Sequence, residues 1–260
     1  VTVSHLRFGP EEIKSEYCIQ NDADFLSCSH PSYVYRYEML EPIAEGGTLV
    51  LNSPWVTMEE MEKKLPAKVK RDIAQKKLNF YNIAATSIAQ QVGLGKRVNM
   101  IMQAAFYALS GVLPQDEAIA LMKESIAEQY KHKGPKVVES NVKAVDATMD
   151  NLKKIEYPAS WANATEGGSR PGKHAMKRPE FVTDIMDPVL ALEGDKLPVS
   201  AFEPGGYQPI GTSQYEKRGI APMIPVWKPD NCTQCNYCAI VCPHAVIRPF
   251  LLEKSEMKSA

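Results

Sequence analysis

The stretch that decides the fold class is residues 47–84, GTLVLNSPWVTMEEMEKKLPAKVKRDIAQKKLNFYNIA. Its two ends, residues 47–53 and 78–84, have the length and composition of β-strands. The intervening residues have a helical pattern long enough to cross over a sheet. Because two strands joined by such a crossover pair in parallel within one sheet, the sequence predicts an α/β fold.

The helical part of this stretch carries its own start and break signals. Thr57 is followed three residues later by Glu60, which is a capping-box signature for a helix that begins there. Pro66 lies inside the helical pattern and should kink or split it, since proline has no N–H to donate. We therefore expect a broken crossover helix.

More strands and helices are expected on both sides of this unit. Strand patterns precede it at residues 2–8, 15–20 and 23–29. From residue 99 to about residue 155 the pattern is helical only, first apolar on nearly all sides and then amphipathic. These helices should pack against a mainly parallel sheet, so residues 1–157 are predicted to form one α/β domain.

The amino-acid composition changes after this domain. Residues 158–231 hold ten of the 19 prolines and eight of the 15 glycines, which argues against long regular elements. Only residues 180–194 look helical, and Pro188 interrupts them. The segment also carries six large aromatic side chains, more than disorder usually tolerates. We interpret residues 158–230 as an ordered, irregular connecting strap.

The strongest chemical signal is CTQCNYCAIVCP at residues 232–243. Its spacing, C-x2-C-x2-C-x3-C-P, is that of bacterial ferredoxins, in which three cysteines bind one 4Fe-4S cluster and the fourth binds another. Cys232, Cys235 and Cys238 would then share a first cluster, and Cys242 would serve a second. Structural zinc is the alternative, but it usually draws two separated cysteine pairs or adds histidine. His244 is interpreted as a surface residue.

Composition narrows the class of protein. The 30 basic and 31 acidic residues give a formal charge of −1, so nucleic acid and anionic membranes are not expected partners. No apolar run is long enough to span a bilayer, and the first residues lack the features of a signal peptide. Four of the six cysteines lie within eleven residues, which favours metal binding in a reducing compartment over disulfides.

Weaker motifs have structural interpretations. VGLGKR at residues 92–97 is read as a helix stop rather than a dinucleotide fingerprint. NSPW at residues 52–55 follows a strand, where α/β sheets bind ligands, but turn chemistry explains it equally well. YEKRG at residues 215–219 is read as a solvated turn in preference to an anion contact. Cys18 and Cys28 are interpreted as small core residues.

Several motifs together resemble those of pyruvate:ferredoxin (flavodoxin) oxidoreductases. The resemblance covers nearly the whole chain, although only the cysteine run is specific by itself. The motifs are TVSHLRFGP, GTLVLNSPW, LPAKVKRDIAQKKLNFYNI, VGLGKRVNMIMQAAFYALSGVLP, PASW, GTSQYEKRGIAPMIPVW and DNCTQCNYCAIVCPHAVIRP.

The resemblance implies an internal fragment of a longer enzyme. Residues 1–157 would be a gamma-type α/β domain that lacks its first strand, followed by the strap at residues 158–230. Residues 231–260 would be the first half of a two-cluster, ferredoxin-like α+β domain. The second cysteine run would follow residue 260, so this chain alone should assemble clusters poorly.

The resemblance also implies an activity. The family oxidises pyruvate with coenzyme A to acetyl-coenzyme A and carbon dioxide, and it passes electrons through 4Fe-4S clusters to ferredoxin or flavodoxin. Thiamine diphosphate and magnesium would be bound by other domains, so no catalytic residue is expected here. The full enzyme would be a homo-oligomer, cytoplasmic or in an anaerobic protist organelle.

Two alternatives remain open from the sequence. One is a non-catalytic electron-transfer subunit of a split 2-oxoacid oxidoreductase. The other is a structural zinc module joined to an α/β interaction domain. Metal content separates the zinc alternative from both iron-sulfur alternatives.

Overall fold

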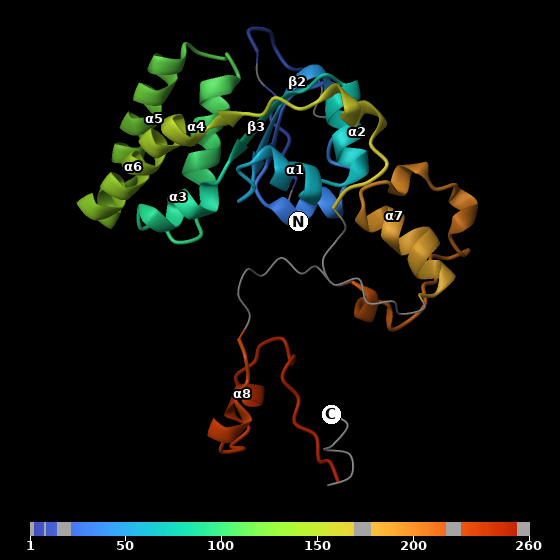
Figure 1. The fold of residues 1–260 in the computed structure, drawn as a ribbon. Helices are drawn as coiled ribbons and strands as arrows, with labels where there is room; N and C mark the ends of the chain where they lie inside the picture. Colours follow the sequence, from blue (N-terminus) through green and yellow to red (C-terminus); the bar gives the residue numbers. More distant parts are fainter. Residues whose placement is uncertain (1–2, 8, 15–21, 169–177, 217–224, 254–260) are drawn as a thin grey trace. The chain divides into compact units, whose positions relative to one another are not determined.

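The computed structural model describes residues 3–7, 9–14, 22–168, 178–216 and 225–253. The chain divides into two units, Val1–Arg218 and Gly219–Ala260. The first unit contains the sheet and most of the helices (Figure 1).

A four-stranded sheet in the order β1-β2-β3-β4 forms the centre of the first unit. Strands β1 (Ala23–Cys28), β2 (Ile43–Asn52) and β3 (Asn79–Ile83) are parallel to one another. The two residues of β4 (Lys153–Lys154) pair antiparallel with β3. The parallel pairing predicted for the ends of the 47–84 stretch is therefore confirmed.

Strand β2 is buried on both of its faces. Leu49 and Leu51 belong to one hydrophobic core, whereas Val50 belongs to another. Successive side chains of a strand point to opposite faces, so β2 requires a covering layer on each side of the sheet. Strand β2 also starts earlier than predicted, at Ile43. An irregularity that includes Gly46, at a φ of +77°, interrupts its alternating sequence pattern, but the strand stays paired with β1 on both sides of it.

Helices α1 (Met58–Lys64) and α2 (Ala67–Gln75) form the layer over the first face. The predicted capping box is present, since the Thr57 side chain accepts the Glu60 N–H and the Glu60 carboxylate accepts the Thr57 N–H. Pro66 separates the two helices, as predicted.

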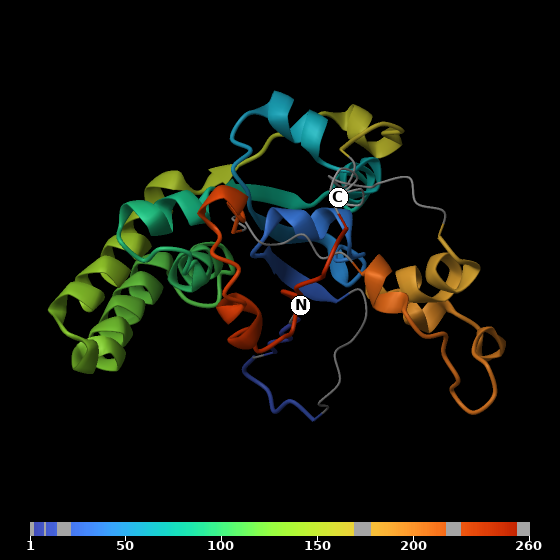
Figure 2. The same ribbon diagram turned by 90° about the horizontal axis from the view of Figure 1, so that it is seen from below.

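The opposite face is covered by helices α3 (Ala85–Gln91), α4 (Asn99–Leu109) and α6 (Pro135–Asn151), with α5 (Gln115–Tyr130) packed on α4 and α6. Figures 1 and 2 show these helices, coloured green, on the side of the sheet away from α1 and α2. The first unit is thus a three-layer α/β fold. Short 3-10 turns η1 (Pro31–Tyr35) and η2 (Lys131–Lys133) lie between these elements along the chain.

The chain returns from α6 across the sheet edge to α1 and α2. The turn η3 (Ala159–Asn163) lies beside these helices (Figure 2). Its Trp161 is 1% exposed, and its indole N–H donates to the Glu62 carboxylate. The buried Lys70 ammonium donates to the same carboxylate over 2.6 Å. This contact ties the beginning of the strap to the crossover helices.

The described strap residues 178–216 consist of short elements. They are the π-helical η4 (Phe181–Met186), α7 (Asp187–Leu190), η5 (Gly194–Lys196), η6 (Val199–Ala201) and η7 (Thr212–Tyr215). Pro188 lies in the first turn of α7, where a missing N–H is harmless. Arg178 makes a bidentate ion pair with Asp187, and the Glu38 N–H donates to the Ala191 carbonyl over 3.1 Å. The described residues 178–216 therefore form short helical elements joined by irregular chain.

Two expectations need correction, and two others lie outside the described residues. The strand expected at residues 2–8 is not formed: its described residues 3–7 are exposed, and no described strand pairs with them. The helical region ends at Asn151, and the next residues form β4 since the Ile155 N–H extends the pairing by donating to the Phe80 carbonyl over 2.8 Å. The expected strand at residues 15–20 and Cys18 lie outside the described residues.

The described part of the second unit, residues 225–253, contains η8 (Pro229–Asn231) and α8 (Tyr237–Ile240). The cysteine run occupies these elements and the turns around them.

We expect Trp161→Ala to lower the free energy of unfolding of the first unit by about 3–5 kcal/mol, because it empties a fully buried site and leaves Glu62 without its indole donor. Urea unfolding followed by circular dichroism measures the loss. Trp227→Ala is the matched control, since Trp227 is 73% exposed and its loss should change stability by less than about 0.5 kcal/mol. Equal stability of the two variants would contradict the packing described for η3.

Candidate metal centre

The four cysteines of residues 232–242 are free thiols on the surface of the second unit. Cys232, Cys235 and Cys238 are exposed, and Cys242 is half-buried. Cys238 lies in α8, while Cys235 and Cys242 lie on either side of that helix. All four sulfurs are therefore in the neighbourhood of one short helix and its two flanking turns.

Local hydrogen bonds shape these turns. The Cys232 N–H donates to the Pro229 carbonyl over 3.0 Å, which closes η8 just before the first cysteine. Helix α8 begins after Asn236, whose carbonyl accepts from Ala239 over 3.0 Å. Helix α8 ends at Ile240, so the chain has left the helical path before Cys242. Pro243, which has no N–H, follows in a turn.

Main-chain N–H groups point at the cysteine sulfurs. The Gln234 N–H donates to the Cys232 Sγ over 3.4 Å, and the Val246 N–H donates to the Cys242 Sγ over 3.4 Å. The N–H of Tyr237, followed by the hydroxyl of Thr233, holds the pKa of the Cys235 thiol below its ordinary value.

The Cys242 thiol is surrounded by donors from the following turn. The N–H of Val246, followed by that of His244, lowers the pKa of this thiol. At both Cys235 and Cys242 these donors stabilise the thiolate more than water stabilises it at an ordinary exposed cysteine.

These four side chains have the right chemistry for an iron-sulfur cluster. Thiolates are the ligands of 4Fe-4S clusters, and N–H donors to sulfur are part of the usual surroundings. Among the residues that the structure describes, however, no three histidine, cysteine, aspartate or glutamate side chains gather closely enough to hold a metal ion. His244 is exposed, in agreement with its interpretation as a surface residue.

The second unit has little apolar packing of its own. Its large hydrophobic side chains in residues 225–253 are exposed: Val226, Trp227, Tyr237, Ile240, Val241, Val246, Ile247, Phe250, Leu251 and Leu252. Leu251 is 104% exposed and Ile240 is 77% exposed. A segment without a hydrophobic core needs another source of folding free energy, such as bound metal or further covering chain.

The NSPW motif is part of a buried polar network at the carboxyl ends of β2 and β3. The Ser53 hydroxyl donates to the Asn82 Oδ1 over 2.7 Å, and the Asn82 Nδ2 donates to the Trp55 carbonyl over 2.9 Å. The Asn52 Nδ2 donates to the Ser29 carbonyl over 2.9 Å. Because these polar groups satisfy one another, the network fastens the strand ends together and supports the turn interpretation.

The VGLGKR motif is a helix stop, as predicted. The Leu94 N–H donates to the Ala89 carbonyl over 2.8 Å, and the Gly93 N–H donates to the Gln90 carbonyl over 3.3 Å, which is the Schellman pattern. Gly93 has a φ of +83°, as this motif requires. The YEKRG motif lies partly outside the described residues, since these end at residue 216 before the gap.

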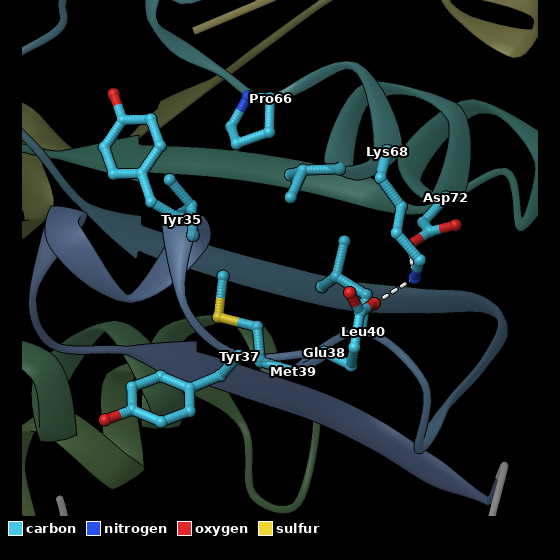
Figure 3. A pocket seen from close by; sticks show the side chains of 10 residues that line it. Tyr35, Tyr37, Glu38, Met39, Leu40, Pro66, Lys68 and Asp72 are labelled. Carbon is cyan, nitrogen blue, oxygen red and sulfur yellow. Dashed lines mark hydrogen bonds and ion pairs between the residues drawn. The ribbon is translucent and has the colours of Figure 1, made fainter. Parts of the chain in front are cut away.

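A pocket of about 150 Å³ lies between η1 and α2 in the first unit (Figure 3). Tyr35, Met39 and Pro66 give it an apolar wall. Lys68 at its rim pairs with Glu38 and, over 3.1 Å, with Asp72. No cysteine lines this pocket.

The sequence did not reveal the left-handed backbone conformation of three residues within and just after the cysteine run. Gln234, Asn236 and Ala245 have positive φ values of 56°, 61° and 51°. Asparagine is enriched in this left-handed region, so Asn236 carried a weak signal. Gln234 and Ala245 carried none.

No helix among the described residues is both long enough and apolar enough to cross a membrane.

Cys28 is a core residue, as predicted, and is 3% exposed. Burial raises the pKa of its thiol from about 9 to about 12. Above pH 9 the unfolded chain loses this proton while the folded chain keeps it, so the free energy of unfolding falls as the pH rises through this window. Between pH 8 and pH 10 we expect Cys28 to account for a loss of about 1 kcal/mol.

Urea unfolding at the two pH values, under reducing conditions, tests this expectation. Cys28→Ala has no thiol to ionise, so its stability should fall by about 1 kcal/mol less over the same interval. The same pH dependence in both proteins would contradict the assignment.

Comparisons with known proteins divide the chain into three matched regions. A protein-family model described as "Pyruvate ferredoxin/flavodoxin oxidoreductase" matches residues 1–151. A domain of unknown function matches residues 169–221. A model described as "4Fe-4S binding domain" matches residues 224–247, which include the four cysteines.

Three similar proteins cover the whole of this chain. "Pyruvate:ferredoxin oxidoreductase" of Moorella thermoacetica is 51% identical over 260 residues, and "Pyruvate dehydrogenase [NADP(+)], mitochondrial" of Euglena gracilis is 52% identical over 262 residues. "Pyruvate-flavodoxin oxidoreductase" of Enterobacter agglomerans is 46% identical over 262 residues. The chain spans 22% of the length of the first and third proteins and 14% of the second.

Proposed function

Because the chain belongs to the pyruvate ferredoxin/flavodoxin oxidoreductase family, we propose that it is the electron-exit part of such an enzyme. The complete enzyme would convert pyruvate and coenzyme A to acetyl-coenzyme A and carbon dioxide. The present chain would supply an α/β scaffold and the cysteine ligands of the 4Fe-4S clusters that carry the outgoing electrons.

One observation carries this proposal. The four cysteines of residues 232–242 have the ferredoxin spacing, lie within the region matched by the 4Fe-4S binding domain, and include sulfurs that accept main-chain N–H groups. Structural zinc also accepts four cysteine thiolates in a tetrahedral arrangement, but zinc sites do not require this spacing.

The cysteines would have different roles. Cys232, Cys235 and Cys238 would bind iron atoms of a first cluster, and Cys242 would bind an iron of a second cluster, whose other ligands are not among these four. When bound, 4Fe-4S clusters accept and pass on single electrons. The N–H groups at Cys232, Cys235 and Cys242 would stabilise the negative charge that accompanies reduction.

The proposed organisation has three parts. Residues 1–157 would be the gamma-type domain, residues 158–230 the strap, and residues 231–260 the beginning of a two-cluster ferredoxin-like domain. Thiamine diphosphate, magnesium and the pyruvate site would belong to other parts of the complete enzyme, which would be a cytoplasmic homo-oligomer. No described residue of this chain is assigned to substrate or to coenzyme A.

The electron acceptor would be ferredoxin or flavodoxin. The names of the three relatives include three acceptors, namely ferredoxin, flavodoxin and NADP⁺, although this chain is 46–52% identical to all three proteins. The choice of acceptor would therefore be made largely by parts of those enzymes outside this region.

We expect Cys232→Ala in the full-length natural protein to leave pyruvate binding unchanged and to abolish reduction of ferredoxin, because the first cluster loses a ligand. Anaerobic isolation followed by iron, sulfide and zinc analysis should also show a loss of iron and sulfide relative to the wild type. Cys28→Ala is the matched control, since Cys28 lies in the core of the first unit and should leave iron content and electron transfer unchanged.

Normal ferredoxin reduction by Cys232→Ala would contradict the proposed ligand role. Zinc without iron in the wild-type protein would instead favour a structural zinc module.

A further inference from the structure

His30 lies between β1 and η1 and is the N-cap residue of η1. Its Nδ1 accepts the Ser32 N–H over 3.2 Å and the Ser32 hydroxyl over 2.8 Å. A main-chain N–H can only donate, so Nδ1 carries no proton while this cap is formed. The usual N-cap side chains, those of serine, threonine, asparagine and aspartate, keep their acceptor oxygens at mildly acidic pH. Histidine provides an acceptor that is lost when the imidazole is protonated.

The surroundings of His30 favour its neutral form. The ring is half-buried and lies against the Tyr33 ring, with 5.6 Å between the centroids. From β1 the Cys28 thiol donates to the His30 carbonyl over 3.3 Å, and from β2 the Asn52 Nδ2 donates to the Ser29 carbonyl over 2.9 Å. None of these neighbours carries a negative charge at or below neutral pH, so none stabilises an imidazolium. Burial accordingly lowers the pKa of His30.

The capped turn η1 connects several parts of the first unit. Its Val34 is 4% exposed and belongs to the hydrophobic core beneath α1 and α2. The Tyr35 hydroxyl donates to the carbonyl of Lys64, the last residue of α1, over 2.8 Å. The Tyr35 ring meets that of Trp55 edge to face, with 6.3 Å between the centroids. Because Val34 and Tyr35 also line the pocket between η1 and α2 (Figure 3), the position of η1 sets one wall of that pocket.

We propose that His30 is an acid-sensitive N-cap, which holds η1 in place while the imidazole is neutral and releases it when the imidazole takes a proton from solvent. The proton at Nδ1 removes the lone pair that accepts the Ser32 N–H, so two donors then face each other. It also adds a positive charge at the N-terminus of a helical turn, where the peptide dipoles oppose it. The inference is independent of the proposed function, because it concerns only the first unit.

The direction of the pH effect follows from the two states of the cap. In the released state the imidazole should titrate near its ordinary pKa of 6.5, whereas the pKa in the capped state is lower. The released state therefore binds more protons below pH 6.5, and the cap weakens as the pH falls through this window. Between about pH 7.5 and about pH 5 we expect the population of the released state to rise about tenfold.

Hydrogen–deuterium exchange of the full-length natural protein, followed by mass spectrometry at these two pH values, tests the proposal. After correction for the intrinsic pH dependence of exchange, the amides of residues 32–37 should be protected about tenfold less at the lower pH. These amides include Tyr33, Arg36 and Tyr37, which donate to carbonyls within the capped turn. Peptides from α6, which contains no histidine, should keep their protection and so report that the rest of the unit stays folded.

Two substitutions separate the loss of the acceptor from other effects of acid. His30→Asn supplies an amide oxygen that can cap η1 and does not titrate, so residues 32–37 should stay protected at both pH values. His30→Leu has no acceptor, so these amides should exchange rapidly at both. His132→Asn is the matched control, because it makes the same change at an exposed histidine in η2 and should keep the pH dependence of the wild type.

Three results would overturn the inference. The first is the same acid-induced loss of protection in His30→Asn as in the wild type. The second is wild-type protection of residues 32–37 in His30→Leu at neutral pH. The third is an equal loss of protection in α6, since the effect of acid would then be global unfolding and not release of η1.

Discussion

Leu49, Val50 and Leu51 of β2 divide their side chains between two hydrophobic cores, and all three are at most 1% exposed. Burying each such side chain contributes roughly 1.5–3 kcal/mol. This strand can be stable only with helices on both faces, which the crossover α1–α2 and the later helices α3, α4 and α6 supply. The arrangement of the first unit follows from that one requirement.

The second unit, in contrast, has no comparable hydrophobic core among its described residues. Its large apolar side chains are exposed across residues 225–253, and its order comes from short-range hydrogen bonds around the cysteines. Metal binding and folding are coupled in small sites of this kind, because ligands must converge and lose protons together. Main-chain N–H groups donate to the sulfurs of Cys232 and Cys242.

The strap connects the first unit, which has hydrophobic cores, to the cysteine segment, which has little apolar packing. At its start, Trp161 is buried against α1 and α2 through the shared carboxylate of Glu62, which Lys70 also contacts. Gly168 passes so close to the Lys64 carbonyl that a side chain would clash with it. The strap therefore begins as part of the α/β scaffold, which fixes the point from which the chain leaves it.

The sequence by itself determined the parallel strand–helix–strand unit, the capping box at Thr57, the break at Pro66 and the identity of the four candidate ligands, because each depends on short-range pattern or spacing. It missed β4, because two lysines have no strand signature and pair only where β3 offers a free edge. It also could not foresee the left-handed backbone at Gln234 and Ala245, since neither residue type favours that region. Only the tertiary structure decided these features, because they arise from contacts that local preference opposes.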